Sequence, residues 1–203
     1  MKPPTVTEAI LANRAKWKYR GQQRPEFAVD PREGQESVWD YPRPPAMVPD
    51  ARHVVVTAPT EDESVVILAD TVKSVKICET AGPPVFYIPP SDVNFEFLKE
   101  LPGSSMCEWK GQARYWALNW KKKKKNDDDD DDDDDEELVA WDYPVPFPEY
   151  NSIAGYVSFY PGKLNCTIHG ERVLPQPGPG FYGGWVTTEV VGPFKGEPGT
   201  EAW

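Results

Sequence analysis

The residue types best suited to chemistry gather at residues 107–116, where a thiol, a carboxylate and an amine lie among large aromatics. Cys107 stands beside Glu108 and close to Lys110, and a nearby cation favours the thiolate form that acts as a nucleophile. The adjacent carboxylate opposes that effect, and a Cys-His pair requires the fold to bring His169 to the thiol. Cys107 is therefore either a reactive nucleophile or a structural thiol.

Glu79 adds a carboxylate at the end of a predicted strand, just before a Gly-Pro-Pro corner. Such a position can hold the carboxylate toward a cleft, and it is also typical of an ordinary solvated strand end. The sequence lacks the Gly-x-Ser-x-Gly, Gly-x-Gly-x-x-Gly and Walker patterns, so it offers neither a serine-hydrolase elbow nor a phosphate loop. The candidate catalytic residues are Cys107, Lys110 and Glu79.

Aromatic side chains near these groups indicate a second chemistry, the recognition of a small molecule in a largely apolar pocket. Alternation along residues 112–118 places Tyr115 on one face of a strand and Trp116 on the other, so only one of those faces can line the pocket. An aromatic wall with one acid and one amine at its rim suits a small zwitterionic or heterocyclic molecule. The competing interpretation is that the same aromatics form the core of a small β domain. The predicted ligand-binding residues are Glu79, Tyr87, Tyr115, Trp141 and Tyr156.

The elements that must position these residues are mostly strands. We expect four strands between residues 53 and 88 to form a meander. A turn or short helix should follow through Leu98, and loops should prevail after Val173. A Thr-x-x-Glu capping box at residues 5–8 predicts one short helix over residues 9–17. The expected fold is all-β: a single compact domain of strongly bent antiparallel sheet, or two small packed sheets, with a short N-terminal helix. Runs of β-branched and aromatic residues predict strands at 53–57, 64–68, 74–78, 85–88, 114–120, 137–141, 156–160 and 165–169.

Composition divides the chain into an N-terminal helix and linker at residues 1–36 and a β domain at residues 37–203. Residues 121–137 comprise five lysines, one asparagine and eleven acids, which cannot bury a core. We therefore expect a disordered charged insertion at about 121–137, between the two strands of a hairpin. This segment accounts for more than half of the formal net charge of −11.

Composition also argues against several classes of partner. The acidic balance argues against binding to a nucleic-acid backbone, and no run of about 18 apolar residues is present to span a bilayer. Three widely spaced cysteines indicate reduced intracellular thiols. The two histidines lie far apart and no Cys-x-x-Cys pair is present, so we expect no metal and no cofactor. The expected location is the cytoplasm or the nucleus, and the oligomeric state stays open.

Several motifs follow the order in which a known family carries them, and they lie at residues 37–44, 79–80, 88–93, 107–116, 141–144, 155–161 and 181–187. From about Ser37 to the C-terminus, the chain resembles the domain-of-unknown-function family 427, whose members are small β-rich proteins without an established activity. The resemblance implies a β-tent arrangement. Family members often carry Ser-His where this chain has Ala81-Gly82, so chemistry that rests on that imidazole is in question here. A nucleotidyltransferase activity is sometimes attributed to the family, but no nucleotide motif in this chain supports it.

Three classes of function follow from these observations. The first is a small-ligand-binding β domain with an aromatic-lined pocket, because aromatic residues are plentiful and acid-base or metal pairs are not. The second is an enzyme of unknown reaction that uses Cys107, Lys110 or Glu79. The third is a structural or interaction protein.

Overall fold

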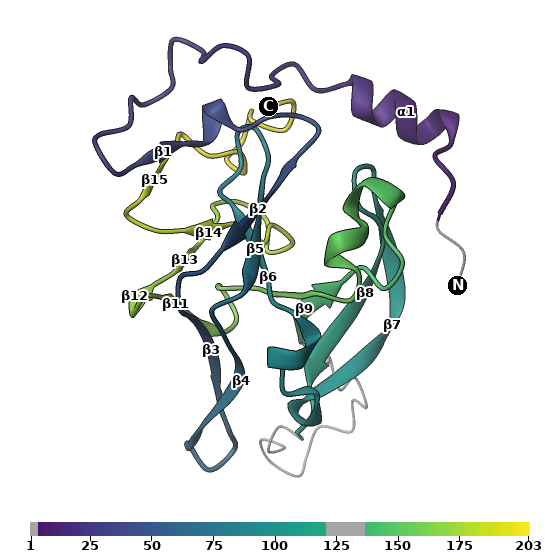
Figure 1. Cartoon of the computed structure of the whole chain (residues 1–203), viewed down its shortest axis with the longest axis vertical. Coiled ribbons are helices and arrows are strands. Elements are labelled where there is room, and N and C mark those ends of the chain that lie inside the picture. Colours follow the sequence, from purple (N-terminus) through teal and green to yellow (C-terminus); the bar gives the residue numbers. More distant parts are fainter. Residues whose placement is uncertain (1–3, 121–136) are drawn as a thin grey trace, which may run out of the picture.

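The structure of the chain is a computed structural model that describes residues 4–120 and 137–203. This part of the chain is mostly β, with several antiparallel sheets, no closed barrel and one short α-helix near the N-terminus (Figure 1). The predicted all-β fold class is confirmed. The α-helix and the longer strands are α1 (Glu8–Ala15), β2 (Ala46–Asp50), β3 (Val54–Pro59), β4 (Val65–Thr71), β5 (Ser74–Cys78), β6 (Val85–Tyr87), β7 (Leu98–Cys107), β8 (Gly111–Leu118), β9 (Leu138–Asp142), β10 (Val157–Phe159) and β11 (Asn165–Ile168). The two-residue strands are β1 (Glu36–Ser37), β12 (Glu171–Arg172), β13 (Leu174–Pro175), β14 (Trp185–Val186) and β15 (Val190–Val191), and the 3-10 helices are η1 (Val38–Asp40), η2 (Pro90–Asp92), η3 (Phe95–Phe97) and η4 (Pro148–Ile153).

One four-stranded antiparallel sheet has the order β10-β9-β8-β7 and carries the chemically interesting stretch. The alternation predicted for β8 is confirmed: Trp116 packs into one core cluster, whereas Ala113 and Tyr115 face another. Strand β7 escaped prediction because Pro102 and Gly103 interrupt its apolar pattern. The pairing of β7 with β8 shifts register around these residues, and such an irregularity lets a strand accommodate proline.

A buried carboxylate ties β8 to β9. The side chain of Asp142 is fully buried and accepts hydrogen bonds from Arg114 Nε at 2.9 Å, Arg114 Nη2 at 2.7 Å and Trp116 Nε1 at 3.1 Å. These charge-assisted bonds compensate the carboxylate for its lost hydration. The end of β9 is thereby fixed, and Tyr143 follows it directly toward the interior.

The predicted meander is wrong, because its four strands divide between two sheets. β3 and β4 belong to the sheet β12-β11-β3-β4, whereas β5 and β6 form a separate sheet with β2. β2 was missed because prolines surround and interrupt it. Its place at the edge of the sheet explains why Pro49 is tolerated there, since an edge strand need not donate every backbone N–H.

The predicted helix is present and slightly shorter than expected. Thr7, rather than Thr5, caps α1 and accepts a hydrogen bond from the backbone N–H of Ile10. Ile10 is buried, so α1 packs on the protein through one apolar residue. The predicted turn or short helix before Leu98 is also present, as η2 and η3.

Three clusters of buried side chains hold the protein together. The largest joins β3, β4 and β8–β11, and the second surrounds Tyr87 and Trp141. Trp185 completes the largest cluster: its side chain is fully buried, and its Nε1 donates to the Phe159 carbonyl at 3.0 Å. The segment after Val173, predicted as loops, thus supplies short strands and an essential core residue.

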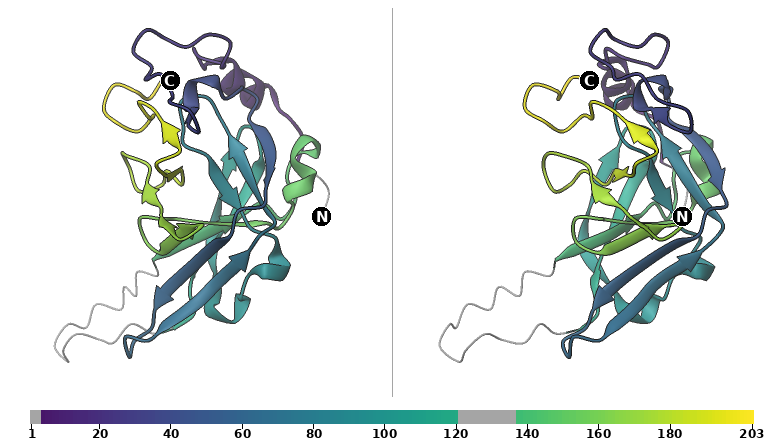
Figure 2. Two further views of the ribbon diagram at one scale, coloured as in Figure 1. Left: turned by 60° about the vertical axis from the view of Figure 1, so that its left-hand side comes forward. Right: turned by 90° about the vertical axis from the view of Figure 1, so that its left-hand side faces the viewer.

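The third cluster joins the segment before β2 to the C-terminal segment, and the two lie together at one end of the molecule (Figures 1 and 2). β1 pairs in parallel with β15, and Trp39 Nε1 donates to the Pro193 carbonyl at 3.1 Å. Phe27, in the linker-like sequence, stacks on Trp203 with ring centroids 4.9 Å apart. The arm before β2 is therefore packed against residues that are remote in sequence.

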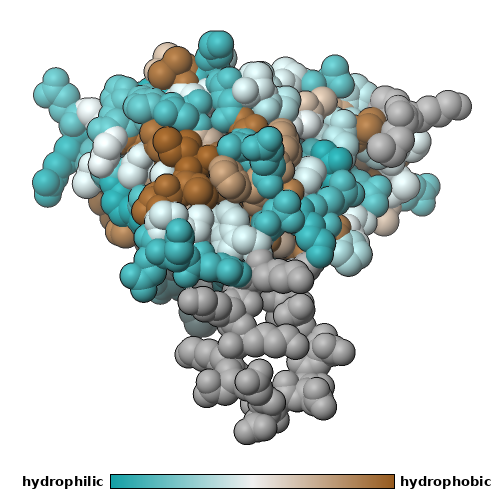
Figure 3. Space-filling model, turned by 90° about the horizontal axis from the view of Figure 1, so that it is seen from below, coloured by the Kyte–Doolittle hydropathy of each residue, from teal (hydrophilic) through white to brown (hydrophobic). Residues whose placement is uncertain are grey.

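The outer edge of one sheet exposes apolar side chains. Val65 and Ile67 of the edge strand β4 are exposed, and the face of the molecule seen from below carries an apolar patch bordered by polar residues (Figure 3). In the described ranges, no helix is both long enough and apolar enough to cross a membrane.

The predicted charged insertion lies, apart from Glu137, outside the described residues. The strands on either side of it pair antiparallel, with Ala117 opposite Leu138. We therefore expect that residues 121–136 can be replaced by a short glycine-containing turn with a change of no more than about 1 kcal/mol in the free energy of unfolding, because loop length affects closure entropy only weakly. Chemical denaturation of both proteins measures this change, and loss of the cooperative transition would contradict it.

Candidate functional site

Lys110 lies in the turn between β7 and β8 and brings a positive charge into the second core cluster. The residue is only 9% exposed, and its Nζ lies 5.8 Å from the ring centroid of Tyr143. In the part of the chain that the structure describes, this amine makes no hydrogen bond or ion pair. Burial lowers the pKa of Lys110, but the surrounding acidic groups, Cys107, Tyr87 and Glu79 among them, raise it more, and the net pKa is raised. Lys110 therefore stays protonated near neutral pH and supplies a fixed cation rather than a base or nucleophile.

Three tyrosine side chains surround this amine. Burial raises the pKa of Tyr87 to about 12, and burial likewise raises the pKa values of Tyr143 and Tyr150 above their ordinary range. Lys110 opposes these shifts at Tyr87 and Tyr150 because a cation favours the phenolate. The Tyr150 hydroxyl donates to the Pro45 carbonyl at 2.9 Å, which links η4 to the start of β2. The phenols are thus neutral donors near physiological pH.

Four of the predicted site residues converge here. Cys107, Tyr87 and Glu79 all lie close enough to Lys110 to raise the pKa of its amine. They come from the end of β7, from β6 and from the residue after β5, so strand ends and the turns that follow them do gather at one place. Cys107 is half-buried, and all three cysteines of the chain are free.

The other three predicted residues belong to the same core cluster. Trp141 Nε1 donates to the Tyr87 hydroxyl at 3.2 Å, whereas Tyr115 contacts Ser105 through its hydroxyl and Tyr156 packs at the margin of the cluster. Tyr87 is 1% exposed and Trp141 7%, so these rings fill the interior of the structure. A role for them in ligand binding remains a prediction.

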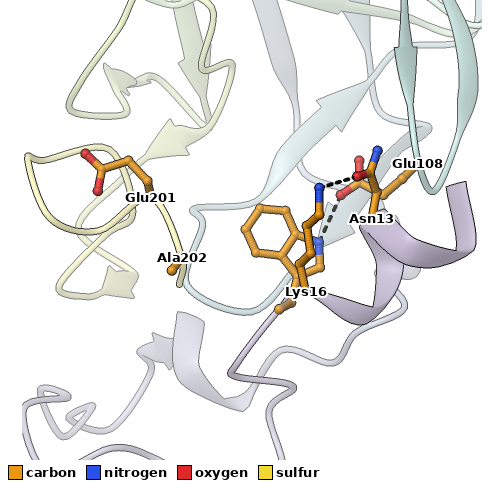
Figure 4. A pocket seen from close by; sticks show the side chains of 6 residues that line it. Asn13, Lys16, Glu108, Glu201 and Ala202 are labelled. Atoms are coloured by element: carbon orange, nitrogen blue, oxygen red, sulfur yellow. Dashed lines mark hydrogen bonds between the residues drawn. The ribbon is translucent and has the colours of Figure 1, made fainter. Parts of the chain in front are cut away.

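A cavity of about 490 Å³ adjoins this cluster. It lies between the end of α1, the β7–β8 turn and the C-terminal segment, and Figure 4 shows Glu201 and Ala202 across the cavity from Asn13, Lys16 and Glu108. Trp17 Nε1 donates to Glu108 Oε1 at 2.9 Å, and Lys16 Nζ donates to Asn13 Oδ1 at 2.6 Å. The lining residues are Asn13, Lys16, Trp17, Glu108, Glu201 and Ala202.

None of the lining residues was predicted from the sequence as a site residue. Trp17 reads as the end of an accessory helix, and Glu201 lies in a segment that reads as loop. The sequence feature that could have indicated the cavity is Glu108, which lies next to Cys107 within residues 107–116. Trp17 and Glu201 are far from residues 107–116 in the sequence, and no local pattern indicates that their segments fold over this stretch.

Two cations cover the indole of Trp17. Arg43 Cζ lies 4.4 Å and Lys195 Nζ 3.6 Å from the ring centroid. Arg43 also donates from Nε to Glu79 Oε1 at 2.9 Å. Glu79 acts on the pKa values of both Lys195 and Lys110, so it connects the cavity wall with the buried cluster.

Comparison with known protein families shows which family the chain belongs to. Residues 46–170, more than half of the chain, match the family described as a domain of unknown function (DUF427). The chain belongs to the DUF427 family. No curated protein matches the chain. Of the residues that line the cavity, only Glu108 lies inside the DUF427 match, because the other walls come from segments before and after it.

The position where DUF427 proteins often carry Ser-His lies close to this region. Ala81 is fully buried with a left-handed φ of 72°, and its carbonyl accepts a hydrogen bond from the backbone N–H of Lys195 at 2.8 Å. A Cβ on Gly82 would meet only the Glu79 carbonyl, at 3.8 Å, which is ordinary van der Waals contact. Within the described residues, no group of three His, Cys, Asp or Glu side chains is placed to hold a metal ion.

Proposed function

We propose that this DUF427 chain is a small-ligand-binding β domain whose ligand occupies the cavity beside Trp17. The observation that supports this most is the cavity itself, since about 490 Å³ lies within the range of roughly 300–1,000 Å³ typical of small-molecule sites. The cavity combines one aromatic wall with charged side chains, as ligand sites commonly do.

The charges around the cavity favour a small zwitterionic or heterocyclic ligand. Lys16 offers a cation, and Glu108 and Glu201 offer carboxylates. Groups of both signs match a molecule that itself carries both signs or several hydrogen-bonding atoms. A nucleic acid or a membrane surface is a poor match for this acidic protein, so we propose neither as a partner.

We propose that the predicted aromatic pocket does not itself hold the ligand but forms a layer of side chains that supports the cavity. Glu79 is linked to the cavity wall through its hydrogen bond with Arg43. We propose that Tyr87, Trp141 and their neighbours Tyr115 and Tyr156 keep this supporting layer rigid. We also propose the β-tent arrangement that the family resemblance implies. A location in the cytoplasm or nucleus is proposed from the three free cysteines.

An enzyme that uses Cys107, Lys110 or Glu79 is the second candidate function. The observation in its favour is the unpaired Lys110 amine close to the half-buried Cys107 thiol. The raised pKa of Lys110 limits that amine to binding or charge stabilisation. A structural or interaction role is the third candidate.

Native mass spectrometry of the purified protein tests ligand binding directly. We expect a retained small molecule, which is lost in Trp17→Ala and kept in Trp120→Ala, where Trp120 is a half-buried tryptophan just beyond the end of β8. A panel of free amino acids and nucleobases should also contain a compound that stabilises the protein by about 2.7 kcal/mol at a hundredfold excess over Kd. If no molecule is retained and no compound shifts the melting temperature, the binding proposal fails.

A further inference from the structure

Lys195 places an amine without a hydrogen-bond or ion-pair partner in the described residues against Trp17, which lines the cavity. Its Nζ lies 3.6 Å from the ring centroid of Trp17, which lines the cavity, and it makes no hydrogen bond or ion pair with any residue in the described ranges. The backbone around it is fixed, because its N–H donates to the Ala81 carbonyl at 2.8 Å and its carbonyl accepts from Gln176 Nε2 at 2.7 Å. The main chain that carries Lys195 is therefore fixed, and its amine lies against the Trp17 ring rather than against a counterion.

The surroundings of this amine disfavour its protonated form. Burial, and after it the nearby Arg43 guanidinium, lower the pKa of Lys195, and against the opposing effect of three carboxylates the net pKa is about 8. A neighbouring cation and partial desolvation are the two conditions that activate a lysine as a nucleophile. The charged groups that face it are Arg43, Glu79, Glu108 and Glu201.

We propose that Lys195 captures the carbonyl group of an aldehyde or ketone that enters the cavity, as a reversible imine. This deepens the proposed ligand-binding function and rests on the cavity being a ligand site. The lysine nitrogen bonds to the carbonyl carbon, and the carbonyl oxygen leaves with both amine hydrogens as water. No oxidant or reductant is consumed. A proton taken up from solvent then converts the neutral imine to its protonated form, whose positive charge lies over the Trp17 indole, where a cation is favoured.

Two other lysines near the site lack these properties. Lys110 has a raised pKa and holds its proton, and Lys16 donates from its amine to Asn13 at 2.6 Å. Lys16 lines the cavity itself and is more exposed than Lys195, so it serves as a control for access of a reagent. A difference in reactivity between Lys195 and Lys16 then reports the state of the amine rather than its exposure.

The test is reductive trapping of 4-carboxybenzaldehyde on the full-length protein with cyanoborohydride, followed by peptide mass mapping. At pH 8 we expect Lys195 to be labelled at least about tenfold faster than Lys16, because an ordinary lysine is almost fully protonated there. The rate at Lys195 should rise with pH and level off above pH 8, whereas the rate at other lysines should keep rising. Lys195→Arg should lose this fast phase.

Labelling of Lys195 that is no faster than that of Lys16 in the wild-type protein overturns the inference, and this outcome needs no variant to fold. The unreactive analogue 4-carboxybenzyl alcohol separates the two proposals. If it protects Lys195 from labelling, the cavity binds the ligand and Lys195 reacts with it. If a ligand found by native mass spectrometry binds normally while Lys195 stays unreactive, the binding function stands and carbonyl capture is rejected.

Discussion

Replacing Trp141 by alanine is expected to lower the free energy of unfolding by about 3–5 kcal/mol, the usual cost of removing a large buried aromatic. Trp141 is 7% exposed, and its ring lies 4.4 Å from that of Tyr160 and 6.3 Å from that of Tyr87. Its Cη2 also lies 2.0 Å from where a Cβ on Gly183 would stand, so the C-terminal segment closes directly over the indole. Truncation leaves a cavity that this segment cannot fill without moving. Urea denaturation measures the loss.

Two further variants make the Trp141 result specific. Trp141→Phe keeps an aromatic ring but removes the hydrogen bond to the Tyr87 hydroxyl, so we expect a smaller loss than for Trp141→Ala. Trp120→Ala removes an indole that is only half-buried and should cost less than Trp141→Ala. A near-neutral midpoint for Trp141→Ala would show that the indole contributes to neither the core nor a binding site.

Alkaline pH should destabilise the protein strongly between about pH 10 and 12. Burial raises the pKa of Tyr87 from 10.0 to about 12, so over this window the unfolded chain releases a proton that the folded chain keeps. The free energy of unfolding therefore falls as pH rises, by roughly 3 kcal/mol for Tyr87 alone. The stability that Tyr87 contributes is fully present below pH 10. The other tyrosines with raised pKa values act in the same direction and are Tyr41, Tyr143, Tyr150, Tyr160 and Tyr182.

Denaturation midpoints across this pH range, together with tyrosinate absorbance, measure the effect. Tyr87→Phe should show a smaller loss between pH 10 and 12 than the wild-type protein. Lys195 acts in the opposite direction from about pH 8 upward, because its lowered pKa means that the folded chain loses a proton that the unfolded chain keeps. Stability that stays constant to pH 12 would contradict the burial of the phenols.

The sequence predicts those features that depend on local patterns. Runs such as 74–78 combine β-branched residues with turn formers on either side, and β5 occupies just that range. The convergence of Glu79, Cys107 and Lys110 follows from their common position at strand ends. Prolines hid β2 and β7, because an edge position and a register shift are tertiary facts that no local pattern records.

The cavity could not be predicted for a different physical reason. Trp17, Glu108 and Glu201 meet only because β1 pairs with β15 and the arm packs on the C-terminal segment. Such contacts depend on which apolar surfaces remain uncovered after the sheets have formed. Lys195 likewise reads as an ordinary surface lysine until Arg43 and Trp17 are placed beside it.

The pairing of β1 with β15 also determines when this protein can finish folding on the ribosome. The nascent chain emerges from its N-terminus, so Trp39 and the other buried residues of the third core cluster, as far as Ala81, leave the ribosome long before residues 190–191 are synthesised. Until Trp185 emerges, the largest core also lacks one of its fully buried side chains. An incomplete chain therefore presents two unfilled apolar surfaces, and the cavity forms among the last features of the molecule.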